Sequence, residues 1–295
     1  FYKGEDLLTM PSATLNRIRG NRMAMIFQDP MTSLNPYLTV ERQMTEVLQF
    51  HKGMNRKSAR ARAVEVLDAV KIPQAASRID MYPHEFSGGM RQRVMIAMAL
   101  LCEPEVLIAD EPTTALDVTV QAQILDLLAE QQRERYMAMI LVTHDLGVVA
   151  ARAQEIAVMY AGRIVEKAPT HALFANMQMP YTEALRRSIP ATGNPPHTRL
   201  HTIPGLPPDL VNPPDGCRFA PRCAYAQDRC RTEEPPLVAS AAALIAAGCS
   251  GGSDSVSLPK MPDLSVAAIT PAAYEKPVGS PTEVYARVAR GANSC

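Results

Sequence analysis

Short hydrophobic runs alternate with helix-like segments along the first part of the chain. Four runs are typical of buried strands because their residues are apolar and β-prone: residues 23–27, 106–109, 139–143 and 156–160. The segments 40–50, 56–70 and 118–135 instead repeat apolar residues at the spacing of one helix face. The last strand run continues after Ala161-Gly162 into residues 163–166, which predicts a hairpin. Strands interleaved with helices in this way predict an α/β fold.

The candidate chemistry lies in the stretch from residue 86 to residue 117. Ser87-Gly88-Gly89 is a small turn that opens an apolar helix, and the bare backbone N–H groups of such a helix start favour an anion. The apolar run 106–109 ends in the carboxylates of Asp110 and Glu111. Ligands gather at the C-terminal edge of α/β sheets, so these carboxylates suit a metal–phosphate site. Together the two features indicate nucleotide phosphate chemistry.

Each feature alone has a simpler interpretation, a plain turn or a strand that runs into a solvated loop. The combination, however, resembles the ABC-type ATPases. Ser87-Gly88-Gly89 with Arg91-Gln92-Arg93 resembles their signature motif, residues 107–112 look like their Walker B strand, and Ala115-Leu116-Asp117 looks like their D-loop. Residues 28–36, which read Gln-Asp-Pro-Met-Thr-Ser-Leu-Asn-Pro, resemble in particular the ATPases of oligopeptide and dipeptide importers.

The resemblance implies roles for individual residues. Asp110 would hold Mg²⁺ and Glu111 would orient or deprotonate the attacking water. Gln28, otherwise a solvated loop amide, would sense the metal and the water. His144, which as an isolated histidine would be structural, follows the next strand, where the family has the switch histidine that contacts the γ-phosphate. Four more residues would lie at the nucleotide of a second ATPase subunit and at the seam between the subunits: Ser87, Gly88, Gly89 and Asp117.

Composition narrows the choice of partners. The 295 residues contain 30 Lys and Arg against 30 Asp and Glu, which gives no sign of a nucleic-acid-binding surface. The longest apolar stretch, residues 94–102, is far shorter than the roughly 20 residues of a spanning helix. We therefore expect the chain to reach a membrane only through a partner.

No G-x-x-x-x-G-K-[ST] phosphate loop occurs in the chain. In the family this loop lies upstream of the position that corresponds to Phe1, so the simplest expectation is a fragment that lacks its N-terminal segment and is inactive alone. A natural degenerate subunit is the alternative.

Prolines are frequent after Ile189, and a group of cysteines follows. Cys217, Cys223 and Cys230 have a spacing unlike that of zinc ribbons, and Cys249 comes later. Importer ATPases carry a similar C-terminal motif, and four thiolates can bind a [4Fe–4S] cluster; zinc or free thiols are the alternatives. Residues 250–295 are rich in Gly, Ser, Pro and Ala, which predicts a disordered tail or linker.

The resemblance thus implies an α/β, P-loop NTPase-type ABC ATPase core over residues 1–170, with an inserted helical subdomain at about 37–102, and an irregular cysteine-containing extension over 171–249. The predicted function is ATP hydrolysis, with Mg²⁺, that energises peptide import. The implied partners are two permease subunits, a second ATPase subunit and, indirectly, a substrate-binding protein, with the chain peripheral on the cytoplasmic face of the inner membrane. A soluble ABC ATPase acting on nucleic acid or ribosomes and an inactive fragment are the alternatives, and the solute is left open.

Overall fold

The computed structural model describes residues 1–114, 116–189, 195, 200–238 and 265–269, which fall into two compact units. The first contains Phe1–Ile26 and Pro30–Val106, and the second contains Phe27–Asp29 and the described residues from Leu107 onward. The domain boundaries expected at residues 170 and 249 stay predictions, because the division into compact units does not bear on them. Every described helix is too short or too polar to cross a bilayer.

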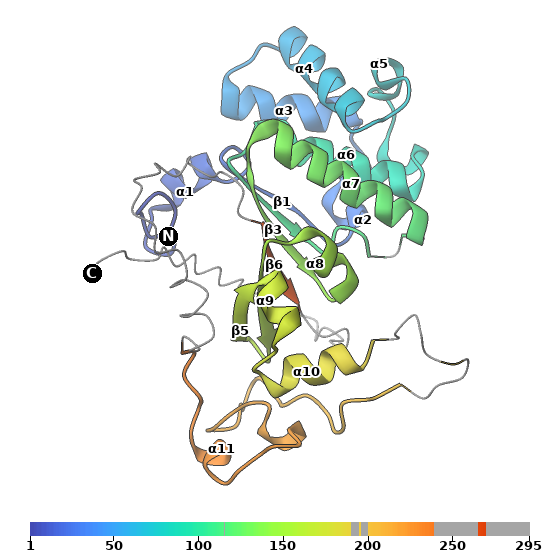
Figure 1. Ribbon diagram of the computed structural model, residues 1–295. Coiled ribbons are helices and arrows are strands. Elements are labelled where there is room, and N and C mark those ends of the chain that lie inside the picture. The colour runs from blue at the N-terminus through green and yellow to red at the C-terminus, as the bar shows by residue number, and fades with distance from the viewer. Residues whose placement is uncertain (115, 190–194, 196–199, 239–264, 270–295) are drawn as a thin grey trace, which may run out of the picture. The chain divides into compact units, whose positions relative to one another are not determined.

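Helices make up most of the first unit (Figure 1). Its elements are α1 (Ser12–Ile18), β1 (Met23–Ile26), α2 (Pro30–Ser33), α3 (Val40–Lys52), α4 (Arg56–Ala69), α5 (Ala75–Arg78), the 3-10 helix η1 (Pro83–Glu85) and α6 (Gly88–Leu100). The predictions for residues 40–50 and 56–70 are confirmed by α3 and α4. In α4 the buried side chains are Ala59, Ala63, Val66 and Leu67, which lie at the spacing of one helix face.

Side-chain caps explain where α3 and α4 begin. The Thr39 hydroxyl accepts a hydrogen bond from the Arg42 N–H at 3.3 Å, and the Asn55 side chain accepts one from the Ser58 N–H at 2.9 Å. Such caps satisfy N–H groups that have no partner within the helix. Gly53 ends α3 with a φ of 63°, a left-handed conformation that glycine adopts without steric cost.

A carboxylate, Glu105, connects the N-terminal residues of the first unit to the segment after α6. It accepts hydrogen bonds from the Tyr2 hydroxyl at 2.6 Å, from Lys3 Nζ at 2.9 Å and from Arg22 Nη1 at 3.0 Å. The bonds from Lys3 and Tyr2 hold the pKa of Glu105 below its usual value. Sequence periodicity gave no indication of this cluster.

The second unit contains the sheet that carries the candidate chemistry. Its elements are β2 (Val106–Asp110, from Leu107 on), α7 (Val118–Arg135), β3 (Ala138–Thr143), α8 (Leu146–Arg152), β4 (Glu155–Tyr160), β5 (Arg163–Pro169), α9 (Thr170–Ala175), α10 (Pro180–Arg187), the 3-10 helix η2 (Ala220–Arg222), α11 (Arg229–Thr232) and β6 (Ser265–Ile269). The strand order is β2-β3-β6-β4-β5. The predicted strands and the helix at 118–135 are confirmed.

The predicted hairpin is formed by β4 and β5, which pair antiparallel. Ala161 and Gly162 make its two-residue turn with φ values of 49° and 79°. Two positive φ angles are typical of the hairpin turn whose twist matches that of the strands. This turn therefore follows from local sequence.

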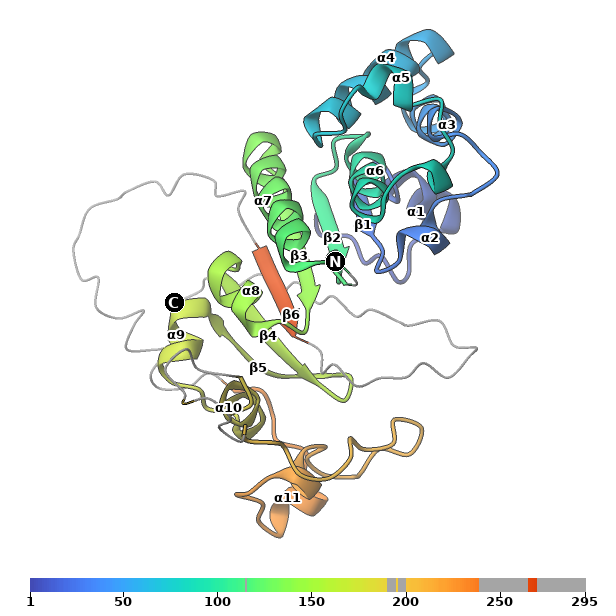
Figure 2. The ribbon, with the colours of Figure 1, turned by 90° about the vertical axis from the view of Figure 1, so that its right-hand side faces the viewer.

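One strand differs from the sequence prediction. Residues 250–295 were expected to form a disordered tail or linker, yet residues 265–269 form β6 between β3 and β4 (Figure 2). β6 is parallel to both neighbours, with Met139 opposite Ser265 and Glu155 opposite Val266. Pairing on both sides satisfies the backbone of this short apolar run, which composition alone does not reveal. The rest of the predicted tail lies outside the described residues.

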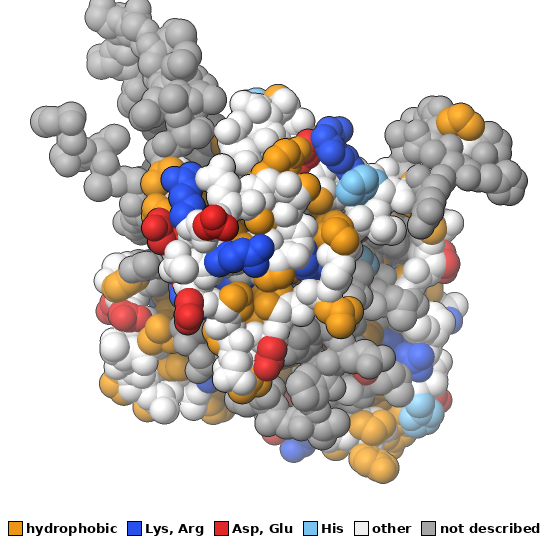
Figure 3. Space-filling view, turned by 90° about the horizontal axis from the view of Figure 1, so that it is seen from below, with side chains coloured by type: hydrophobic (Ala, Val, Ile, Leu, Met, Phe, Trp, Pro, Cys, Tyr) orange, Lys and Arg blue, Asp and Glu red, His pale blue; other side chains and the backbone are white. Residues whose placement is uncertain are grey.

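Three rings hold the C-terminal extension, by which we mean the described residues 200–238, against β4 and α10. Phe219 packs edge-on against Tyr160 and Tyr181, with ring centroids 5.2 Å and 5.3 Å away, and the two tyrosine rings are 4.6 Å apart. All three side chains are buried. Arg222 adds a hydrogen bond to the Tyr160 hydroxyl at 3.2 Å and another to the Pro204 carbonyl at 2.9 Å. The face seen in Figure 3 intersperses basic, acidic and hydrophobic described side chains.

Candidate functional site

Glu111 follows β2 directly and stands at the centre of the candidate site. Its backbone N–H donates to the carbonyl of Val142 in β3 at 2.9 Å. Its φ of 45° lies in the left-handed region, which is uncommon for a residue with a side chain. Such conformations persist only where the surroundings hold them, and they cluster at functional sites.

Three side chains contact the Glu111 carboxylate. Gln28 Nε2 donates to Oε2 at 3.0 Å, and the Thr114 hydroxyl donates to the same oxygen at 2.8 Å. His144 Nδ1 lies 3.1 Å from Oε1. All four residues belong to the second unit. The structure thus brings together the three predicted residues Gln28, Glu111 and His144.

Local structure explains the position of His144. It lies between the end of β3 and the start of α8. The Asp145 side chain caps α8 by accepting hydrogen bonds from the N–H groups of Gly147 at 2.8 Å and Val148 at 3.2 Å. A cap fixes the entry angle of the chain into the helix, so the preceding histidine stays at the same sheet edge as Glu111.

The predicted carboxylates Asp110 and Asp117 flank Glu111 along the chain. Asp110 is the last residue of β2 and is partly buried. Asp117 is the N-cap of α7 and accepts a hydrogen bond from the Val120 N–H at 3.0 Å. The turn from Glu111 to Asp117 therefore joins the end of the strand to the start of the helix.

The predicted signature residues lie in the first unit. Ser87 is the N-cap of α6, as the sequence predicts, and its hydroxyl accepts a hydrogen bond from the Met90 N–H at 3.4 Å. A Cβ added to Gly88 would meet no atom within 4 Å. Packing among the described residues therefore does not require a glycine at this helix start.

The structure describes three of the four cysteines that the sequence assigns to a cluster. Cys217 and Cys223 pack against the apolar cluster that contains Phe219, and Cys223 Sγ and Cys230 Sγ accept hydrogen bonds from local N–H groups at 3.4 Å and 3.5 Å. In the part of the chain that the structure describes, no three His, Cys, Asp or Glu residues are placed to hold a metal ion. Cys249 lies outside the described residues, so the four-thiolate site stays a prediction.

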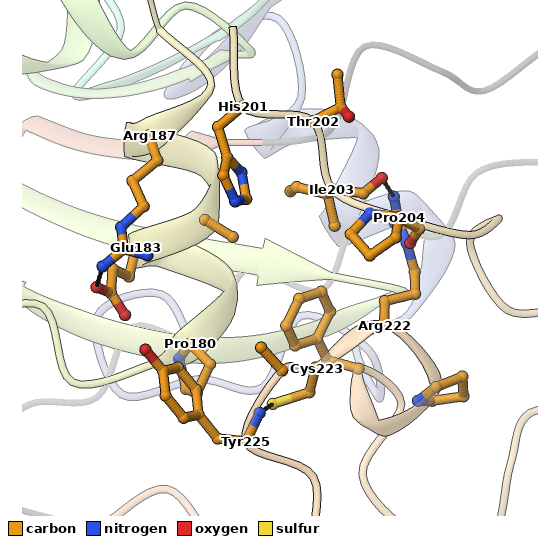
Figure 4. Close-up of a pocket in the computed structure, with 14 residues that line it drawn as sticks. Pro180, Glu183, Arg187, His201, Thr202, Ile203, Pro204, Arg222, Cys223 and Tyr225 are labelled. Atoms are coloured by element: carbon orange, nitrogen blue, oxygen red, sulfur yellow. Dashed lines mark hydrogen bonds and ion pairs between the residues drawn. The ribbon is translucent and has the colours of Figure 1, made fainter.

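A cavity of about 400 Å³ is lined by residues of α10 and of the C-terminal extension (Figure 4). Its lining includes Arg187 and Glu183 of α10, which pair with each other at 2.5 Å, and Arg222, which is turned toward the Pro204 carbonyl. The charged groups of the lining are thus paired within the protein. This cavity contains none of the residues that the sequence assigned to phosphate chemistry.

Sequence reasoning missed Thr114. The sequence feature that could have indicated Thr114 is a hydroxyl residue between the Asp-Glu pair and the Ala-Leu-Asp motif. A threonine in a turn is usually explained by turn formation alone, so only the 2.8 Å contact with Glu111 identifies it.

Comparison with known proteins gives two family models and a group of relatives. The model described as "ABC transporter" matches residues 2–114, and the model described as "Oligopeptide/dipeptide transporter, C-terminal region" matches residues 165–230. The oligopeptide transport ATP-binding protein OppD of Haemophilus influenzae is 56% identical over 231 residues, which are 78% of this chain and 71% of that protein. The dipeptide transport ATP-binding protein DppD of Escherichia coli is 52% identical over 236 residues, 80% of this chain and 72% of that protein.

Proposed function

Because the chain belongs to the family of ATP-binding proteins of oligopeptide and dipeptide ABC transporters, we propose that it is the subunit that couples ATP hydrolysis to peptide import. The observation that carries this proposal is the Glu111 carboxylate, contacted by Gln28 and His144 at one edge of the sheet. A carboxylate held beside an amide and an imidazole can orient and deprotonate a water molecule that attacks a phosphate.

Each residue of this group has one task in the proposal. Glu111 orients the attacking water and accepts its proton, a form of catalysis typically worth roughly 10²–10⁴-fold in rate. Gln28 and His144 orient the carboxylate and, with nucleotide bound, the water and the terminal phosphate. Asp110 and the Gln28 amide oxygen would supply ligands for Mg²⁺, which usually takes one or two carboxylates together with substrate phosphates. Mg²⁺ neutralises charge on the phosphates when bound.

Ser87 and the two glycines after it form the proposed contact with the nucleotide of a second ATPase subunit. The start of α6 presents backbone N–H groups that favour an anion. The open space beside Gly88 supports this role, because a phosphate can then approach the backbone closely. Asp117, at the start of α7, is proposed to lie at the seam between the two subunits.

The missing phosphate loop leads to a separate proposal. The 295 residues contain no G-x-x-x-x-G-K-[ST] sequence, so we expect them to bind ATP weakly by themselves. Titration of the purified chain with a fluorescent ATP analogue measures this. Micromolar affinity would contradict the proposal.

The relatives named above are components of peptide transport, and the proposed assembly follows from them. The chain works with two permease subunits, a second ATPase subunit and, indirectly, a substrate-binding protein. It is peripheral, on the cytoplasmic face of the inner membrane. An ATPase acting on nucleic acid or ribosomes is not favoured, because both family models describe transporters.

The [4Fe–4S] cluster remains a prediction from the cysteine spacing, outside the mechanism proposed for ATP. Backbone N–H groups directed at Cys223 Sγ and Cys230 Sγ support it, since hydrogen bonds to the sulfurs are a feature of iron–sulfur sites. The absence of a metal-holding group among the described residues stands against it.

The test of the function uses the chain placed behind a phosphate-loop segment from a relative and expressed with the other transporter components in cells deficient in peptide uptake. Uptake of labelled peptides is expected, and Glu111→Gln should abolish it because the base is lost while the shape is kept. Glu233→Gln, an exposed carboxylate of the same unit, is the matched control and should leave uptake unchanged. Full uptake by the Glu111→Gln variant would overturn the role of Glu111.

A further inference from the structure

Thr114 contacts Glu111 twice. Its backbone N–H donates to the Glu111 carbonyl at 3.2 Å, which closes a turn over residues 111–114. Its hydroxyl donates to Glu111 Oε2 at 2.8 Å. The same residue therefore holds both the main chain and the carboxylate of Glu111.

The remaining contacts leave little freedom for this carboxylate. Oε2 also accepts the 3.0 Å bond from Gln28, and Oε1 faces His144 at 3.1 Å. Only 18% of the Glu111 side chain is exposed to solvent. Gln28 and His144 reach the carboxylate from distant parts of the chain, whereas Thr114 belongs to the turn that Glu111 itself begins.

The turn extends this connection to helix α7. The Leu116 N–H donates to the Thr113 carbonyl at 3.3 Å, and Asp117 then caps α7. Thr114, which lies between the strand end and the helix start, reaches back to the Glu111 carboxylate with its side chain.

We propose that Thr114 is a positioning residue for Glu111, which fixes the orientation of Oε2 through its hydroxyl. This inference deepens the proposed function, because the orientation matters chemically only if Glu111 acts on the attacking water. Geometry of this kind has large effects on rate, since a displacement of 1 Å can cost roughly 10²-fold. The contact itself can be tested without nucleotide.

The experiment records the carboxyl ¹³C signal of Glu111 in the full chain labelled at the glutamate side-chain carboxyl. The signal is assigned by its loss in Glu111→Gln. Thr114→Val keeps the branched shape and removes the donor, so the Glu111 signal should shift, and the ring signals of His144 should shift with it. Thr114→Ser keeps a hydroxyl and should return both signals to their wild-type positions.

The matched control is Thr113→Val, which makes the same chemical change one residue earlier. The Thr113 carbonyl keeps its bond from Leu116, so the Glu111 signal should not move. Backbone amide spectra establish that each variant is folded. A folded Thr114→Val variant with an unmoved Glu111 signal would overturn the proposal, as would an equal shift in Thr113→Val. Because peptide uptake tests the function separately, a failure of that assay is distinguishable from a failure of this contact.

Discussion

The aromatic cluster that holds the extension makes a quantitative prediction for Phe219→Ala. The Phe219 side chain is only 2% exposed and packs edge-on against Tyr160 and Tyr181. Burial of a phenylalanine contributes about 1.5–3 kcal/mol, and each aromatic pair adds about 0.5–1.5 kcal/mol. These ranges agree with the roughly 3–5 kcal/mol that Phe→Ala substitutions cost in protein cores.

This loss should appear locally. Phe219 lies in the extension, whereas its two partners lie in β4 and α10, so the substitution weakens the docking of the extension first. A cost of 3–5 kcal/mol corresponds to an opening equilibrium raised by roughly 100- to 4,000-fold. Hydrogen exchange of the peptides around residues 217–223 measures this opening, and strand β3, which contributes no residue to this buried cluster, serves as the internal reference.

Tyr225→Ala is the control for Phe219→Ala, because Tyr225 is an aromatic residue of the same extension with 60% of its surface exposed. Surface substitutions usually change stability by less than about 0.5 kcal/mol. Unchanged exchange in Phe219→Ala would refute the reasoning. The same increase in both variants would also refute it, because burial would then not be the cause.

Three further predictions concern single groups. Burial raises the pKa of Tyr181 to about 12, and its hydroxyl has no partner among the described residues. Tyr181→Phe should therefore leave the free energy of unfolding in urea unchanged or raise it by up to about 1 kcal/mol. A clear loss of stability would contradict this. Bonds from Lys3 and Tyr2 lower the pKa of Glu105, so its contribution to stability is present at pH 7 and is lost as the pH falls below 4.5 and through the lowered pKa. The urea midpoints of wild type and Glu105→Gln should therefore differ slightly at pH 7, because the pair is exposed, and should converge in that window. A difference that stays constant with pH would refute the assignment. The chain purified anaerobically should contain iron and sulfide, and Cys223→Ser should lose them; zinc without sulfide, or no metal, would rule out the cluster.

Local patterns account for most of what the sequence predicted correctly. The apolar spacing in α4, the Ser87 cap of α6 and the Ala161-Gly162 turn each depend on residues close together in the chain. The resemblance to ABC-type ATPases also selected Gln28, Glu111 and His144, and in the structure Gln28 and His144 each contact the Glu111 carboxylate.

Features that depend on distant residues were not predictable in the same way. The bonds to Glu105 come from residues far away in the chain, such as Lys3 at a separation of 102 positions. The contact of Phe219 with Tyr160 likewise has no periodic signature. Thr114 is close in sequence to Glu111, but the direction of its hydroxyl depends on a left-handed residue that composition does not reveal.

The position of β6 has a consequence for the order of events during synthesis. β4 ends at Tyr160 and β6 begins at Ser265, so about 100 residues must still be made after β4 before the strand that separates it from β3 exists. At roughly 5–20 residues per second, this takes about 5–20 seconds. Throughout that interval the inner edges of β3 and β4 have unpaired backbone groups, which invite pairing with other chains. The growing polypeptide is therefore exposed to aggregation while β3 and β4 are already complete, and slower translation of the residues before β6 should lengthen this period.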